Sequence, residues 1–117
     1  MDAIAKYGLW GLKGFAALAF IAAGSMKLIG VPDMVAVFDT IDLGQWFRYV
    51  TGMIEIASAV LLFVPGLQLI GAGLLAATML GAVLAHLFII GPSMVPALVL
   101  LIVVSLIAWA HRPRVRA

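Results

Sequence analysis

The chain consists of four long apolar runs separated by short polar or turn-forming stretches. The runs cover residues 9–29, 46–64, 67–90 and 94–110. At 1.5 Å per helical residue each is about 25–36 Å long, comparable to a hydrocarbon core of about 30 Å. Lipid offers the backbone no hydrogen-bond partners, so such runs must be helical, and the alternation typical of a membrane β-barrel is absent. The pattern predicts one all-α domain over residues 1–117, an integral membrane four-helix bundle.

Proline and glycine mark the ends of these runs. Pro65 and Gly66 close the second run and predict a tight hairpin into the third. The Gly-Pro-Ser stretch at 91–93 closes the third run. Pro96 falls in the first turn of the fourth, where the missing N–H of proline costs little.

The connection between the first two runs has a helical pattern of its own. Apolar residues recur at helical spacing and carboxylates take the positions between them: Met34, Val35, Phe38 and Ile41 against Asp33, Asp39 and Asp42. This pattern predicts a short amphipathic helix over about 33–42, lying at the membrane interface. Trp46, Phe47 and Tyr49 follow, as expected where a chain re-enters the bilayer through its aromatic belt.

The composition supports a membrane protein and narrows the possible functions. Hydrophobic residues make up 66% of the chain and charged residues 10%, whereas soluble domains average about 45–50% and about 25%. The absence of cysteine removes disulfides, thiol redox chemistry and thiolate metal ligands, and the pattern indicates no metal site. The net charge of +2 includes no basic block that would suggest binding of nucleic acid.

The basic residues predict the orientation. One side of the expected bundle holds both termini and five basic residues: Lys6, Lys13, Arg112, Arg114 and Arg116. The other side holds Lys27 and Arg48. Positive residues favour the cytoplasmic side, so we expect both termini in the cytoplasm and the protein in a bacterial inner membrane. Lys13 is expected to snorkel from the inner end of the first span.

Three ionisable residues lie within the spans or at their ends, on the non-cytoplasmic side: Lys27, Glu55 and His86. A charged residue at a helix centre costs about 2.5–3.5 kcal/mol on insertion scales, so such residues face the bundle interior and find partners. Helical side chains lean toward their own N-terminus, which brings Lys27 and Glu55 together as the expected direct pair. His86 is expected above them, at the mouth of a small polar pocket.

Two threonines complete the candidate site. Thr51 lies one turn from Glu55 on the same face, and Thr78 lies at a similar height on the third span. The predicted ligand-binding residues are therefore Lys27, Thr51, Glu55, Thr78 and His86. Each ionisable residue also has a purely structural interpretation: Lys27 and His86 as interfacial polar tips, and Glu55 as a charge that fixes helix packing. Small residues at every fourth position of the third span (Gly73, Ala77, Gly81 and Ala85) predict a close-packed seam.

Three short motifs give the chain a family resemblance. They are GSMKLIG at 24–30, GMIE at 52–55 and GAVLAHLF at 81–88. In this order and spacing they resemble the DoxX-like family of small four-span membrane proteins, the DoxX/DoxD group, over about residues 8–110. The resemblance implies a four-helix membrane bundle with polar positions at Lys27, Glu55 and His86.

The family implies less about activity. DoxD is associated with thiosulfate:quinone oxidoreductase and another related group with methylamine utilisation, while most relatives have no assigned function. A thiol-dependent role is excluded here because the chain has no cysteine.

Three functions are consistent with these residues. In the first, a redox-accessory or binding subunit holds a lipophilic molecule such as a quinone, with Lys27 or His86 donating to its carbonyl. Electrons would come from a partner subunit, since only two histidines, one of them the terminal His111, make a bis-histidine haem improbable. In the second, Glu55, Lys27 and His86 are the catalytic acid and base of a small membrane isomerase, hydrolase or cyclase. The third is transport or assembly, in which a homo-oligomer would supply the further helices that a pathway needs. The cofactor is left open.

Overall fold

The computed structural model describes residues 3–90 and 94–112, and every regular element in this part of the chain is a helix. In chain order they are α1 (Ala3–Ile29), α2 (Pro32–Ile41), α3 (Trp46–Leu61), α4 (Gln68–Ala85), the π-helical turn η1 (His86–Ile90) and α5 (Val95–Ala110). The predicted all-helical fold is confirmed.

Apart from shifts of one residue, the helix bounds differ from the predicted spans in three places. α1 begins at Ala3, six residues before the predicted start, because the preceding residues include the good helix formers alanine and lysine and no proline. α3 ends at Leu61 rather than at residue 64, because residues 62–67 form the turn around Pro65 and Gly66. Gly66 has a φ of +83°, a backbone conformation that glycine adopts without strain. The third run is divided into α4 and η1.

Two predicted breaks have different outcomes. Pro96 lies in the first turn of α5, as expected. The predicted break at 91–93 lies outside the described residues.

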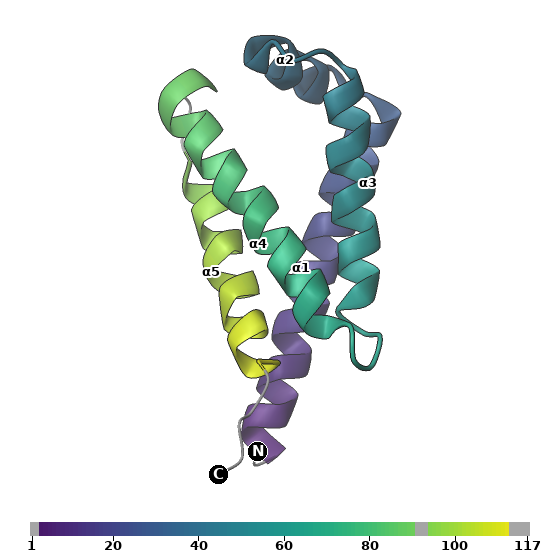
Figure 1. Cartoon of the computed structure of the whole chain (residues 1–117), viewed down its shortest axis with the longest axis vertical. Coiled ribbons are helices and arrows are strands. Elements are labelled where there is room, and N and C mark those ends of the chain that lie inside the picture. The colour runs from purple at the N-terminus through teal and green to yellow at the C-terminus, as the bar shows by residue number, and fades with distance from the viewer. Residues whose placement is uncertain (1–2, 91–93, 113–117) are drawn as a thin grey trace.

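The helices form two antiparallel pairs that meet at one end and separate toward the other (Figure 1). α1 packs along α3, and α4 packs along α5. The α3–α4 turn joins the pairs at the closed end, where α1 also begins and α5 ends (Figure 1). At the open end α2 lies over the ends of α1 and α3 and contacts η1 (Figure 1). This arrangement leaves a wedge between the pairs.

The hydrophobic core fills the closed end of the wedge. Its buried members come from all four long helices and from the turn after α3: Ala16, Phe20, Ala59, Leu62, Ala72, Leu75, Val104 and Ile107. Glycines allow the backbones to approach closely there. A Cβ on Gly71 would lie 2.7 Å from the carbonyl oxygen of Ser58, so α4 crosses α3 at these two residues. The core therefore holds the two pairs together mainly below the level of Glu55.

The predicted close-packed seam on α4 is wrong. Gly73 and Gly81 have no atom within 4 Å of the place where a Cβ would stand, and Ala77 is exposed. The packed face instead consists of Gly71, Ala72, Leu75 and Met79. Residues 73, 77 and 81 each come two positions after a packed residue (71, 75 and 79). Two positions correspond to about 200° around the helix, so these residues point away from the packed face.

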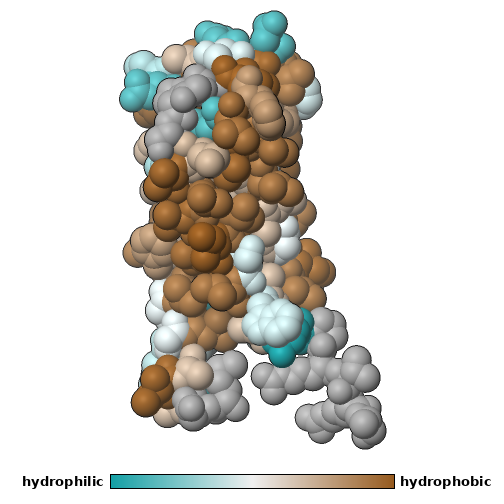
Figure 2. Space-filling model, turned by 90° about the vertical axis from the view of Figure 1, so that its left-hand side faces the viewer, coloured by the Kyte–Doolittle hydropathy of each residue, from teal (hydrophilic) through white to brown (hydrophobic). Residues whose placement is uncertain are grey.

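Large apolar side chains cover the outside of the bundle. Leu18, Ile70 and Ile102 are 75%, 54% and 54% exposed. Figure 2 shows hydrophobic residues over the middle of one face and hydrophilic residues gathered toward its ends. Within the described chain, two helical segments, Ala3–Ile29 and Gln68–Ile89, are long and apolar enough to cross a membrane, and α5 is a shorter apolar helix. An apolar belt of this extent is suited to lipid.

Candidate functional site

A buried ion pair joins α1 to α3. Lys27 Nζ lies 2.8 Å from Glu55 Oε1, and the Glu55 side chain is only 1% exposed. The direct contact expected from the sequence is therefore present. Isolated charges are costly in an apolar interior, and here each has its counter-charge within hydrogen-bonding distance.

Two glycines explain why these residues meet. A Cβ on Gly24 would lie 2.7 Å from the Gly52 carbonyl oxygen, and one on Gly52 would lie 2.9 Å from that of Gly24, so the helices cross at this pair. Lys27 and Glu55 each follow a crossing glycine by three residues and share its helix face. The helices are antiparallel and side chains lean toward their own N-terminus, so Lys27 and Glu55 both lean back toward the crossing.

Arg48 fixes the end of α1 beside this pair. It is 5% exposed, donates from Nη1 to the carbonyl oxygen of Lys27, and donates from Nε to Gln45 Oε1 at 2.7 Å. It thereby satisfies one of the unpaired carbonyls at the helix C-terminus, where a positive charge is also favourable. From the sequence, Arg48 bears only on the predicted topology, and its contact with the Lys27 carbonyl was not predicted.

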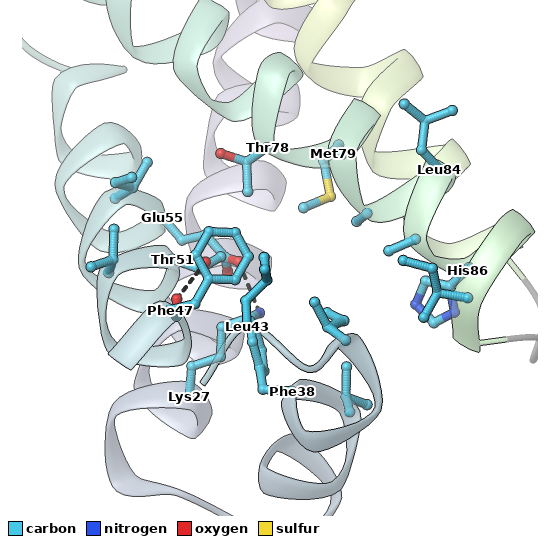
Figure 3. Close-up of a pocket in the computed structure, with 18 of the residues that line it drawn as sticks. Lys27, Phe38, Leu43, Phe47, Thr51, Glu55, Thr78, Met79, Leu84 and His86 are labelled. Carbon is cyan, nitrogen blue, oxygen red and sulfur yellow. Dashed lines mark hydrogen bonds and ion pairs between the residues drawn. The ribbon is translucent and has the colours of Figure 1, made fainter. Parts of the chain in front are cut away.

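A pocket of about 660 Å³ occupies the wedge between the two helix pairs (Figure 3). α2 covers it with the apolar face recognised in the sequence, including Met34, Phe38 and Ile41. Other apolar wall residues come from α3, α4 and η1: Phe47, Val50, Ile54, Met79, Ala82, Leu84, Phe88 and Ile89. These residues were not predicted as part of a site. The spacing of apolar residues in α2 did identify the face of α2 that covers the pocket.

All five predicted site residues line this pocket. Lys27, Thr51 and Glu55 lie together on the α1–α3 side, and Thr78 and His86 lie on the opposite wall (Figure 3). No ion pair joins His86 to Glu55 in the described structure. His86 begins the π-helical turn η1, a local geometry that frequently accompanies functional sites. The pocket thus has separate polar groups on facing walls.

The polar groups of the pocket are mainly hydrogen-bond acceptors. Thr51 donates its hydroxyl hydrogen to the Phe47 carbonyl at 2.8 Å, and Thr78 donates to the Leu74 carbonyl at 2.8 Å. Each hydroxyl oxygen then retains lone pairs that can accept. Both carboxylate oxygens of Glu55 and the Nδ1 atom of His86 are buried without a hydrogen-bond partner in the described structure, and Oε1 has the ammonium of Lys27 as its ion-pair partner. Buried polar atoms normally have partners, so these atoms favour a ligand.

The described residues contain no group of three or more His, Asp or Glu side chains that could hold a metal ion. The polar groups of the pocket are instead one ion pair, two hydroxyls and one imidazole. Such groups suit hydrogen bonding to an organic molecule.

A buried lysine lies at the closed end, far from the pocket. Lys13 is 3% exposed, with Nζ 4.4 Å from the centroid of the Trp10 ring and 3.4 Å from His111 Nε2. The expectation that Lys13 snorkels into solvent is therefore wrong, because these rings enclose the amine. Burial and the charge of Lys13 lower the pKa of His111.

Comparison with known families agrees with this architecture. The model of the DoxX-like family matches residues 11–110, so the chain belongs to the DoxX-like family. No match was found among curated proteins or among solved structures. Family membership and the two long apolar helical segments together indicate a membrane protein.

Proposed function

We propose that this DoxX-like protein binds a lipophilic small molecule, such as a quinone, in the pocket between its helix pairs. The observation that carries the proposal is the combination of about 660 Å³ of mainly apolar space with a buried Lys27–Glu55 ion pair in its wall. Ligand sites commonly combine apolar walls with a few well-placed polar groups.

The proposed setting is a bacterial inner membrane crossed by α1, α3, α4 and α5, with both termini in the cytoplasm. The exposed apolar side chains along these helices support this arrangement. α2 would then lie at the outer interface, over the open end of the wedge. A hydrophobic ligand would enter from the lipid between the separated helix pairs, where the wall residues Leu84 and Phe88 are 47% and 76% exposed.

Binding is favoured over acid–base catalysis by the geometry of the charged groups. Lys27 and Glu55 neutralise each other, and His86 lies on the opposite wall without a hydrogen-bond partner on Nδ1 in the described structure. A general base normally lies within hydrogen-bonding reach of the proton that it takes, and a third group orients it. We therefore propose a binding or redox-accessory subunit, in which a partner protein supplies any electrons.

Two leucine substitutions on α4 test the location of the ligand. Gly81 lines the pocket and has free space around its Cβ position, so Gly81→Leu adds a side chain to the pocket without a backbone clash. Gly73 has equally free space but does not line the pocket, so Gly73→Leu is the matched control. Binding of a decyl-chain quinone to the detergent-solubilised protein is measured by calorimetry.

We expect Gly81→Leu to weaken binding about tenfold or more, while Gly73→Leu binds as the wild type does. Thermal unfolding of both variants verifies that the helices remain folded. Equal affinity of wild type and Gly81→Leu would place the ligand outside this pocket. Mass spectrometry of molecules extracted from the purified protein then identifies the natural ligand, and absence of any lipophilic compound would argue against the proposal.

A further inference from the structure

The Lys27–Glu55 ion pair is made through one carboxylate oxygen. Oε1 lies 2.8 Å from Lys27 Nζ, whereas neither carboxylate oxygen has a hydrogen-bond partner in the described structure, and both are buried. Leaving a buried acceptor without a hydrogen bond costs more free energy when the acceptor belongs to a charged group than when it is neutral. The pocket therefore needs a hydrogen-bond donor beside Glu55.

The neighbouring side chains do not supply it. Thr51, one turn away on α3, donates its hydrogen to Phe47, and Thr78 on the opposite wall donates to Leu74. The Lys27 ammonium carries three N–H donors, and its nitrogen lies 2.8 Å from Oε1 in the ion pair. The polar wall thus combines an unmet carboxylate oxygen, threonine lone pairs and the remaining donors of Lys27.

We propose that the pocket selects lipophilic molecules whose head group carries a hydroxyl, such as a phenol or the reduced quinol form of a quinone, and that this hydroxyl donates to Glu55. A hydroxyl can donate to Oε2 while its oxygen accepts from Lys27. A carbonyl or an ether oxygen can only accept, and it leaves Oε2 unmet. The inference rests on the proposed function, because it assigns the head group of the ligand in that same pocket.

The apolar part of such a ligand has a complementary wall. Phe38, Phe47 and Met79 line the pocket together with Glu55, and Phe38 and Phe47 contact each other with ring centroids 5.9 Å apart. An aromatic head group would lie against these side chains with its hydroxyl toward the ion pair (Figure 3). The remaining apolar wall toward Leu84 and Ile89 would receive an alkyl tail.

A matched pair of ligands tests the selection without altering the protein. 4-Nonylphenol and 4-nonylanisole have the same ring and tail, but the second has a methyl ether in place of the hydroxyl. We expect the detergent-solubilised wild type to bind the phenol about ten- to a hundredfold more tightly, as expected for one hydrogen bond to a charged group. Calorimetry at fixed detergent concentration, corrected for partition of each compound into empty micelles, measures the ratio.

Glu55→Gln tests the assignment to a single oxygen. The amide keeps a carbonyl oxygen for Lys27 and places an NH₂ donor where Oε2 was. We expect this variant to lose the preference for the phenol or to reverse it in favour of the anisole. A purely structural effect would weaken both compounds equally. Ser58→Ala is the matched control, since Ser58 is buried one turn deeper on α3 and does not line the pocket.

The outcomes separate this inference from the function on which it rests. Equal binding of both compounds by the wild type, blocked in both cases by Gly81→Leu, would overturn the selection for a hydroxyl and leave the binding function intact. Failure of the wild type to bind either compound or the decyl-chain quinone would overturn both. Should Glu55→Gln fail to fold, the double variant Lys27→Met with Glu55→Leu supplies a second test. It removes the carboxylate acceptor together with its counter-charge, so the phenol-to-anisole ratio should fall to about one.

Discussion

Two lysines on one helix, Lys13 buried and Lys27 half-buried, have different kinds of partner. Lys13 and Lys27 lie fourteen residues apart on α1, about 21 Å along its axis. Lys27 faces the carboxylate of Glu55 at 2.8 Å. Lys13 lies instead over the Trp10 ring and beside the His111 imidazole, with centroid and nitrogen distances of 4.4 and 3.4 Å.

The difference separates packing from a candidate site. Aromatic faces attract a cation with about 0.5–2 kcal/mol and leave no anion behind when the lysine is removed. A buried carboxylate is far more demanding, because its charge requires the partner. Lys13 therefore seals the closed end where α1, α5 and the α3–α4 turn come together, whereas Lys27 and Glu55 depend on each other beside an open pocket.

The largest contrast is expected from methionine at the two lysine positions. Lys27→Met leaves the fully buried Glu55 without its counter-charge, so we expect a loss of about 3–5 kcal/mol in the free energy of unfolding. Lys13→Met keeps an apolar side chain over Trp10 and leaves no carboxylate without a counter-charge. We therefore expect the free energy of unfolding to fall by less than about 1 kcal/mol. Unfolding in detergent, followed by circular dichroism, measures both.

A double variant decides whether the pair itself explains the loss. Lys27→Met combined with Glu55→Leu removes both charges, and we expect it to recover most of the stability lost by Lys27→Met alone. Equal destabilisation by Lys13→Met and Lys27→Met would break the contrast between the two lysines.

Glycines near the two lysines give the next largest effect. A Cβ on Gly24 would lie 2.7 Å from the Gly52 carbonyl oxygen and 2.7 Å from Ile56 Cγ1, so Gly24→Ala should separate α1 from α3 at a cost of about 1–3 kcal/mol. Gly14, next to Lys13, has nothing within 4 Å, so Gly14→Ala should be neutral or stabilise by up to about 1 kcal/mol. Thermal unfolding compares them, and tolerance of alanine at 24 would contradict the close crossing.

A smaller difference in stability is expected between two arginines, Arg48 at the open end of the bundle and Arg112 at the closed end. Both donate to a carbonyl at a helix end and stack on the neighbouring aromatic ring, but Arg48 is buried and Arg112 is exposed. Lysine cannot reproduce the two separate donations of Arg48, so Arg48→Lys should cost about 1–2 kcal/mol. Arg112→Lys should stay within about 0.5 kcal/mol, as is usual on a surface. A larger loss from Arg112→Lys, measured by thermal unfolding, would reverse the comparison.

The helices and the ion pair were accessible from sequence because local rules determine them. Apolar length, Pro65-Gly66 and the direction in which helical side chains lean predict the helices and the meeting of Lys27 with Glu55. The spacing Gly-x-x-Lys at 24–27 and Gly-x-x-Glu at 52–55 could also have predicted the crossing, since both glycines share a face with the paired residue.

The face on which α4 packs was not accessible in the same way. Both Gly71 and Gly73 begin a row of small or apolar residues at helical spacing, and the row that starts at Gly73 looked the more regular. Which row packs depends on the rotation of α4 about its axis, and the tertiary contact of Gly71 with Ser58 sets that rotation. The enclosure of Lys13 is likewise tertiary, because Phe63 and His111 come from distant parts of the chain.

The smallest expected effect is a pH dependence confined to the Lys13 end. Burial, and then the charge of Lys13, hold the pKa of His111 below its usual value of about 6.5. The unfolded chain therefore binds this proton more readily than the folded protein. The stability that His111 contributes is complete above about pH 6.5 and falls as the pH drops from there toward the lower pKa of the folded state.

The neutral His111 ring can accept a hydrogen bond from the Lys13 ammonium through Nε2, 3.4 Å away. Protonation of His111 would instead place a second positive charge at this distance. His111→Gln keeps a side chain that can accept from Lys13 but does not titrate, so its melting temperature should fall less between pH 7.5 and 5.5 than that of the wild type. The difference should be small, because the ring is partly exposed and solvent screens the repulsion. Parallel pH profiles for the two proteins would show that Lys13 and His111 are not coupled, and the aromatic rings alone would then account for the burial of Lys13.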